Sequence, residues 1–179
     1  MTRLQALDPQ TATGKTKELF NAVQGKLGSV PNMMRTMGNS DVVLEGYLNL
    51  SGALSKGKLN ARTGELIALA VSESNSCYYC LAAHTFIGEQ LLKTDLAVLK
   101  AARAGESSDA KTQAILQLAK VLVSKNGRVS DADVNAAKTA GVTDGEIAET
   151  VAHVALNVLT NYFNNTANTA VDFPAVSAL

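Results

Sequence analysis

The sequence predicts an all-α protein, and three observations lead to this fold class. Proline occurs only 3 times in 179 residues, aromatic residues make up 4% of the chain, and Ala and Leu are frequent. Alternating runs of β-branched residues, which are typical of strands, are absent. Hydrophobic residues make up 46% of the chain and charged residues 18%, so amphipathic helices can bury a core.

Capping residues bound the first two predicted helices. Thr13 can cap a helix that ends at Gly28, before Pro31. Ser40 can cap a second helix, which Gly57 closes. Each carries apolar residues at helical spacing, namely Leu19, Phe20 and Val23 in the first and Val43, Tyr47, Leu50 and Leu54 in the second. We therefore expect both helices to pack through one face.

The third predicted helix should be buried on every side. Asn60 can cap a helix over 61–73, and residues 66–71 of it form an unbroken apolar run with Glu65 at its edge. A helix that is apolar all round is a buried one. The polar residues 74–76 then break the chain, and the next helix is expected over 77–92.

Shorter helices and one long helix complete the chain. The shorter ones are expected over 95–103, 109–125 and 130–139, with glycines at their connections. The long one begins after 142–143 and extends towards Asn168. The segment 171–174 should be extended, because the residue before a proline avoids the α region.

A weak internal similarity links residues 65–71 to residues 146–152. After the second segment, Asn161 and Asn165 stand where Cys80 and His84 follow the first. The fold could therefore contain an internal helical duplication with one active half, although helical sequences of similar composition explain the same likeness. The last helix also carries a polar stripe of Asn161, Asn164, Asn165 and Asn168, which we expect to make buried hydrogen bonds between helices or subunits.

Charge and hydropathy exclude several classes of partner. Sixteen basic and 16 acidic residues give a formal net charge of zero, which argues against nucleic acid as the main partner. No apolar stretch reaches the roughly 18 residues that a membrane span needs. Residues 1–10 contain no apolar segment of a secretory signal, so we expect a cytoplasmic, reducing location. Two cysteines three positions apart then favour redox or metal chemistry over a structural disulfide.

The segment 74–84 carries the most specific signal, because Cys77, Cys80 and His84 would share one face of a helix. The polar break places Cys77 in the first turn, where free backbone N–H groups and the helix dipole lower a thiol pKa. His84 can take the proton of Cys80. Such a pair can attack a peroxide, form a sulfenic acid, condense to a disulfide and be reduced by an external dithiol.

Two other interpretations of the cysteines remain open. They could be two small buried hydrophobic residues on an amphipathic helix. Cys77, Cys80 and His84 could also hold zinc, although a structural zinc site usually has four ligands and no fourth one lies nearby.

Glu65 and His153 are further candidates. Glu65 lies twelve positions before Cys77, so antiparallel packing of the two helices would bring it to His84 for a proton relay. Alternatively, Glu65 is a first-turn carboxylate that favours the helix dipole. His153 lies in an apolar helix and is expected to be a satisfied core or interface histidine. Tyr78 and Tyr79 should pack or line the site.

Glu65, Cys77, Cys80 and His84 together resemble the motif of the alkylhydroperoxidase D (AhpD-like) family, within the carboxymuconolactone decarboxylase superfamily. The segment 161–174 also looks like the tail of family members, and the resemblance covers about 59–174. It differs at Tyr79, where some members have a histidine between the two cysteines, so a second relay histidine is not expected there.

The resemblance implies a single all-helical AhpD-like domain over 1–179, with N-terminal helices in 1–58 and a catalytic core in about 59–174. It implies a homo-oligomer, a trimer or hexamer. Cys80 would attack a hydroperoxide, Cys77 would resolve the intermediate, and Glu65 and His84 would relay the proton. No cofactor is implied beyond an external dithiol or reductase. The helix dipole favours Cys77 as the attacking thiol and the proximity of His84 favours Cys80.

Two competing functions follow from the same residues. One is a decarboxylase-like enzyme that uses Glu65 and His84 as acid and base. The other is a non-enzymatic redox or metal-binding module.

Overall fold

The computed structural model describes residues 1–177 and 179, and over these residues it is built from α-helices and one π-helical turn, without strands. The predicted all-α fold class is therefore confirmed. The helices are α1 (Gly14–Leu27), α2 (Asn32–Met37), α3 (Asp41–Leu54), α4 (Ala61–Ser74), α5 (Tyr78–Phe86), α6 (Leu96–Ala104), α7 (Ala110–Ser124), α8 (Asp131–Thr139) and α9 (Asp144–Ala167), with the π-helical turn η1 (Ile87–Leu91) after α5.

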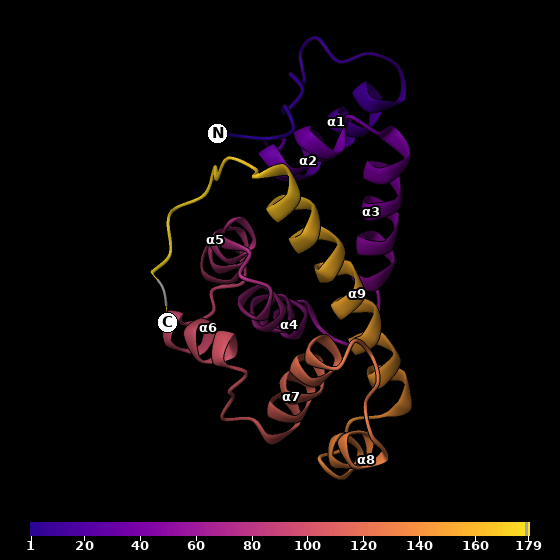
Figure 1. Ribbon diagram of the computed structural model, residues 1–179, viewed down its shortest axis with the longest axis vertical. Coiled ribbons are helices and arrows are strands. Elements are labelled where there is room, and N and C mark those ends of the chain that lie inside the picture. The colour runs from indigo at the N-terminus through magenta and orange to yellow at the C-terminus, as the bar shows by residue number, and fades with distance from the viewer. Residues whose placement is uncertain (178) are drawn as a thin grey trace.

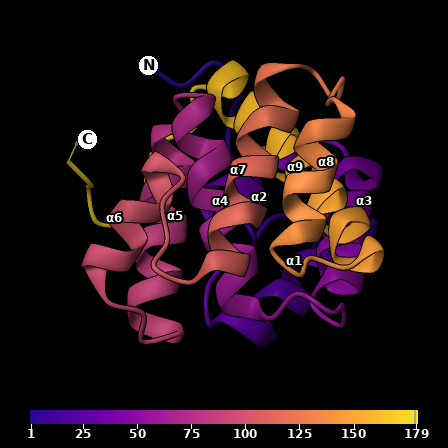
Figure 2. The same ribbon diagram turned by 90° about the horizontal axis from the view of Figure 1, so that it is seen from below.

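Helix α4 is the centre of the molecule, with α5 and α6 on one side of it and α9 on the other (Figure 1). Figure 2 shows the same order after a turn of 90°. The side-chain oxygen of Asn60 accepts the N–H of Thr63 and caps the helix, as predicted. Residues 66–71 are all buried against α6, α7 and α9. The prediction of a helix buried all round is therefore confirmed.

A second apolar cluster, formed by the N-terminal helices, surrounds the cysteines. Phe20, Val23, Val30, Met33, Met34, Met37 and Leu44 pack there with Cys77, Tyr79, Cys80 and Ala83. All three methionines of this cluster belong to α2, a helix that the sequence patterns do not indicate. This helix has six residues and follows Pro31, so it is too short to show helical periodicity.

The predicted helix over 77–92 agrees with α5 and η1 within one residue at each end, and the structure adds two details. Cys77 has an extended backbone and acts as the N-cap of α5, because its sulfur accepts the N–H of Cys80. Cys80, rather than Cys77, therefore lies in the first turn. After Phe86 the chain widens into η1, where a side chain on Gly88 would come within 2.6 Å of Leu99. Close packing of η1 on α6 therefore requires glycine at this position.

The other predicted helices agree with the structure within a residue or two, except that α3 ends at Leu54, before Gly57. Helix α9 runs without interruption for 24 residues after a capping box of Thr143 and Glu146. The segment after 146–152 therefore forms one straight helix, whereas the segment after 65–71 turns between α4 and α5. No helix among the described residues is long and apolar enough to cross a membrane.

Candidate active site

The turn between α4 and α5 places the two cysteines. Ser76 adopts a left-handed backbone with φ of 51°, which turns the chain sharply after α4. The N–H of Cys77 then donates to the carbonyl of Ser72, one turn back on α4. Cys77 and Cys80 form a disulfide across the first turn of α5, with their Cα atoms 5.3 Å apart. The structure therefore brings the predicted pair together in its oxidised state.

Both sulfurs are enclosed, and each accepts a hydrogen bond. Cys77 is 0% exposed and Cys80 is 2% exposed. The backbone N–H of Cys80 donates to the sulfur of Cys77 at 3.3 Å. The side-chain amide of Asn164 donates to the sulfur of Cys80 at 3.4 Å. Hydrogen bonds of this kind favour the thiolate over the thiol.

Glu65 and His84 form a hydrogen-bonded pair beside the cysteines. Because α5 folds back on α4, Oε2 of Glu65 lies 2.7 Å from Nδ1 of His84, although the two are 19 residues apart. Both side chains are about one-fifth exposed, at 20% and 22%. When Nδ1–H donates to the carboxylate, the lone pair of Nε2 is free to accept a proton. His84 follows Cys80 by one helical turn, so the pair can serve that thiol.

Helix α9 is fixed to the cysteine turn by its asparagines. Asn161 donates to the hydroxyl of Ser72 at 3.2 Å and accepts from Asn75 at 3.0 Å. Asn165 donates to the carbonyl of Asn75 at 2.9 Å. The predicted buried hydrogen bonds are therefore present for Asn161 and Asn164, whereas Asn165 and Asn168 are exposed. The bonds of Asn161 and Asn165 hold the turn that carries Cys77.

The tyrosines at 78 and 79 have different roles. Tyr78 is 70% exposed, whereas Tyr79 is 5% exposed and packs edge-on against Phe173, with ring centroids 5.7 Å apart. The hydroxyl of Tyr79 accepts the N–H of Met33 at 3.1 Å, at the start of α2. Burial raises the pKa of Tyr79, so this hydroxyl stays protonated. Tyr79 therefore ties the cysteine segment to α2 and to the C-terminal tail.

Tyr47 belongs to the surroundings of the site, although its sequence position indicates only a place on the apolar stripe of α3. Its ring packs against the cluster that contains the cysteines. Burial and the nearby negative charge of Glu65 raise the pKa of Tyr47 to about 12. Tyr47 is thus a neutral hydroxyl close to the Glu65–His84 pair.

His153 differs from the satisfied histidine that its sequence context predicts. Its Nε2 atom is buried and has no hydrogen-bond partner among the described residues. The ring lies against Gly64, where an added Cβ would be 3.1 Å from Cε1. Burial lowers the pKa of His153, and the charges of Glu149 and Glu65 oppose this effect. We therefore correct the prediction, because a polar atom of this ring is left unpaired.

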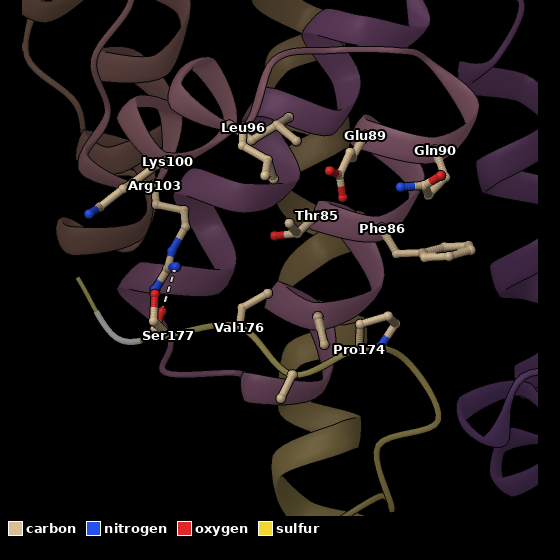
Figure 3. A pocket seen from close by; sticks show the side chains of 13 residues that line it. Thr85, Phe86, Glu89, Gln90, Leu96, Lys100, Arg103, Pro174, Val176 and Ser177 are labelled. Carbon is tan, nitrogen blue, oxygen red and sulfur yellow. Dashed lines mark hydrogen bonds between the residues drawn. The ribbon is translucent and has the colours of Figure 1, made fainter.

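A cavity of about 390 Å³ lies next to the site, between α5, η1, α6 and the C-terminal tail (Figure 3). Thr85, Phe86 and Glu89 line one wall of it and Pro174 lies opposite. Arg103 pairs with Glu73. Arg103 also donates to the carbonyl of Ser177, which fastens the tail. The residues that line the cavity include neither cysteine, whereas Glu65 and His84 beside the cysteines are themselves partly exposed.

Within residues 1–177 and 179, no three His, Cys, Asp or Glu side chains are grouped closely enough to hold an ion. Cys77 and Cys80 bond to each other, and the Nδ1 atom of His84 is engaged by Glu65.

Comparison with known proteins agrees with the motif and the fold. Residues 42–90, which include Glu65, Cys77, Cys80 and His84, match the model of the carboxymuconolactone decarboxylase family. No curated protein sequence matches the chain.

Among solved structures, the chain is similar to an uncharacterized peroxidase-related protein from Ralstonia eutropha JMP134, described as an alkylhydroperoxidase AhpD core. The two structures give a TM-score of 0.85 at 24% sequence identity, and the match covers 96% of this chain and 92% of that one. An uncharacterized peroxidase-related protein from Silicibacter sp. TM1040 gives a TM-score of 0.80, 24% identity and coverage of 95% and 94%.

The debrominase Bmp8, in complex with 2,3,4-tribromopyrrole, gives a TM-score of 0.77, 18% identity and coverage of 96% and 90%. At these identities, the likeness to the solved structures shows the fold. Residues 42–90 thus resemble the carboxymuconolactone decarboxylase family, and the solved structures show that the chain shares the fold of AhpD-like proteins.

Proposed function

We propose that the protein is a thiol peroxidase that reduces hydrogen peroxide or organic hydroperoxides. One observation carries the proposal: the Cys77–Cys80 disulfide lies one helical turn from His84, whose Nδ1 atom is held by Glu65. A dithiol, a proton acceptor and a group that orients the acceptor are the parts that such a reaction needs.

The first step oxidises Cys80. His84 takes the thiol proton at Nε2, and Glu65 stabilises the resulting imidazolium. The Cys80 thiolate attacks the terminal oxygen of the hydroperoxide, so that an S–O bond forms and the O–O bond breaks. The leaving oxygen receives the proton from His84 and departs as an alcohol, or as water when the substrate is hydrogen peroxide. Cys80 is left as a sulfenic acid.

The next two steps restore the enzyme. The thiol of Cys77 attacks the sulfur of the sulfenic acid, releasing water and forming the Cys77–Cys80 disulfide. An external dithiol, free or carried by a reductase, then reduces this disulfide and becomes a disulfide itself. The cycle needs no further cofactor, because the dithiol supplies both electrons.

We also propose that the protein works as a homo-oligomer, a trimer or hexamer. Large apolar side chains are exposed on the outer faces of two neighbouring helices, namely Val42, Val43 and Leu50 of α3 and Val151, Leu159 and Tyr162 of α9. Exposed apolar side chains on adjacent helices favour association when they meet a second copy of the chain. Light scattering of the purified protein tests the subunit number, and a monomer at all concentrations would contradict the proposal.

Peroxide consumption tests the function directly. Wild-type protein, Cys77→Ser and Cys80→Ser are each supplied with cumene hydroperoxide or hydrogen peroxide and with dithiothreitol. We expect the fastest turnover in the wild type, slower turnover in Cys77→Ser, where dithiothreitol must reduce the sulfenic acid itself, and none in Cys80→Ser. Without dithiothreitol, Cys77→Ser should accumulate a dimedone-reactive sulfenic acid and Cys80→Ser should not. Full turnover by Cys80→Ser would overturn the proposal.

The Glu65–His84 pair also suits acid–base chemistry of the decarboxylase kind, and this is the second candidate function. It uses no thiol, so it predicts an activity that survives alkylation of both cysteines. Loss of all activity on alkylation with iodoacetamide would exclude it and favour the peroxidase.

A further inference from the structure

Asn164 is the buried polar residue that the cycle above does not use. It lies on α9 and is 3% exposed. Its amide nitrogen donates to the sulfur of Cys80 at 3.4 Å, and its amide oxygen has no hydrogen-bond partner among the described residues. Buried polar groups are rarely left unpaired, because the protein then bears the full cost of their desolvation. The unpaired oxygen therefore points to a ligand that is present only in some states of the site.

We propose that Asn164 is a further catalytic residue, whose amide holds the sulfur of Cys80 as the attacking thiolate and then receives its sulfenic acid. This inference deepens the proposed peroxidase function and rests on it for the sulfenic acid step.

The side-chain N–H of Asn164 bears on which of the two cysteines is the attacking thiolate. A hydrogen bond from a neutral N–H strengthens when its acceptor becomes an anion, so the Asn164 amide stabilises Cys80 more as a thiolate than as a thiol. Cys77 receives its hydrogen bond from the backbone N–H of Cys80 and none from Asn164. Asn164 therefore adds to Cys80 a stabilisation that Cys77 does not share.

The acceptor half concerns the intermediate. When the peroxide transfers its oxygen, Cys80 gains an O–H group that needs an acceptor in a site closed to water. The carbonyl oxygen of Asn164 belongs to the same amide that touches the sulfur, so it lies within reach of that hydroxyl. No bond of Asn164 forms or breaks, and its amide is unchanged at the end of the cycle.

The position of Asn164 is fixed independently of the sulfur. One turn earlier on α9, Asn161 is bonded to Ser72 in the last turn of α4 and to Asn75 at the start of the cysteine turn. This anchor sets the rotation of α9, and Asn164 then points to Cys80 in the absence of substrate. Preorganised donors are effective because they need no rearrangement during the reaction.

The test measures the thiol pKa of each cysteine from the pH dependence of alkylation by iodoacetamide. Cys77→Ser reports on Cys80, and Cys80→Ser reports on Cys77, each with and without Asn164→Leu. We expect Asn164→Leu to raise the thiol pKa of Cys80 by about one unit or more and to leave that of Cys77 within a few tenths. Asn164→Asp should raise the thiol pKa of Cys80 further, since it replaces the donor with a negative charge.

Asn157→Leu is the matched control, because it removes a buried amide of the same helix whose nitrogen donates to the carbonyl of His153 and not to a sulfur. It should lower stability without a selective change at Cys80. If Asn164→Leu shifted the thiol pKa of both cysteines equally, or of neither, the proposal would be overturned. Asn164→Ala provides the same comparison if circular dichroism shows that the leucine variant is misfolded.

The alkylation assay contains no peroxide, so it is independent of the proposed function. A selective shift at Cys80 in a protein that does not consume peroxide would refute the peroxidase and keep the thiolate role of Asn164. Peroxide turnover without a selective shift in the thiol pKa of Cys80 would keep the peroxidase function and refute the thiolate role of Asn164. Adding Asn164→Leu to Cys77→Ser should also shorten the lifetime of the Cys80 sulfenic acid, as measured by trapping with dimedone. An unchanged lifetime would refute the role of the Asn164 oxygen as an acceptor.

Discussion

Oε2 of Glu65 and Nδ1 of His84 lie 2.7 Å apart, which joins the first half of α4 to the second half of α5. The contact fixes both the tautomer and the orientation of the imidazole, because only the Nδ1–H form can donate to the carboxylate. The histidine then presents Nε2 as the atom that takes a proton.

Replacing Glu65 by glutamine tests this relationship. Glutamine keeps the shape of the side chain but cannot stabilise an imidazolium, so kcat/KM for peroxide should fall by about 10²-fold or more. Steady-state peroxide consumption with saturating dithiol measures the effect. Glu18→Gln, which changes an exposed surface carboxylate, should retain wild-type activity. A Glu65→Gln enzyme with the activity of Glu18→Gln would show that the carboxylate has no part in catalysis.

The Tyr79 hydroxyl should contribute to stability. Tyr79→Phe leaves the buried N–H of Met33 without its acceptor, which costs about 1–3 kcal/mol. Urea unfolding of the oxidised protein measures the loss. The neighbouring Tyr78 is 70% exposed, so Tyr78→Phe should change stability by no more than about 0.5 kcal/mol. Equal stabilities for the two variants would mean that the bond to α2 contributes nothing.

His153 should make the protein less stable in mild acid. Burial lowers its pKa below the ordinary value of 6.5, so the unfolded chain binds the proton more readily than the folded chain. The contribution of this histidine is complete above pH 6.5 and is lost as the pH falls through the lowered pKa of the folded state.

His153→Gln removes the titration and keeps a side chain of similar size. The variant should therefore gain stability relative to wild type between pH 7.5 and pH 5, as measured by urea midpoints at the two pH values. The carboxylates titrate in both proteins, so their effects cancel in the difference. A constant difference between the two proteins at both pH values would contradict the lowered pKa.

Replacement by alanine should change stability in opposite directions at two glycines, Gly38 and Gly46. A Cβ at Gly38 would lie 2.5 Å from the ring of Phe20, which is 1% exposed and has no room to move. Gly38→Ala should therefore destabilise the fold by about 1–3 kcal/mol. Gly46 lies within α3 with nothing near its Cβ position, so Gly46→Ala should stabilise the protein by about 0.5–1 kcal/mol. Thermal unfolding of both variants decides, and a change of the same sign in both would contradict the packing described.

Local sequence signals were enough to predict most of the fold. The cap at Asn60, the apolar run over 66–71 and the glycine at 28 each act within a few residues of their effect. Glu65 and His84 could be paired in advance because two consecutive helices joined by a short turn fold back on each other. The start of α5 was misplaced by one residue, because a cysteine is an uncommon N-cap and the side chains preferred there precede it at 74–76.

The contact between Asn164 and Cys80 could not be predicted in the same way. The two residues are 84 positions apart, and their contact depends on how α9 is rotated about its axis. The polar stripe indicates that several asparagines of α9 are buried. Which of them meets the sulfur is decided by the bonds of Asn161 to Ser72 and Asn75, which no local pattern reveals.

The placement of α9 has a consequence for the order in which the protein matures. The backbone N–H of Arg3 and the carbonyl of Met1 bond to the C-terminal end of α9, at Ala167 and Asn168, so residues before α1 are held by a helix that lies far later in the sequence. A chain grows from its N-terminus, and the cysteines therefore emerge long before Asn164. During synthesis both thiols lack this partner and the cover of α9, so their reactivity at that stage is that of ordinary exposed cysteines. On the role proposed for Asn164, docking of the completed helix is the step that distinguishes Cys80 from Cys77 and encloses both sulfurs.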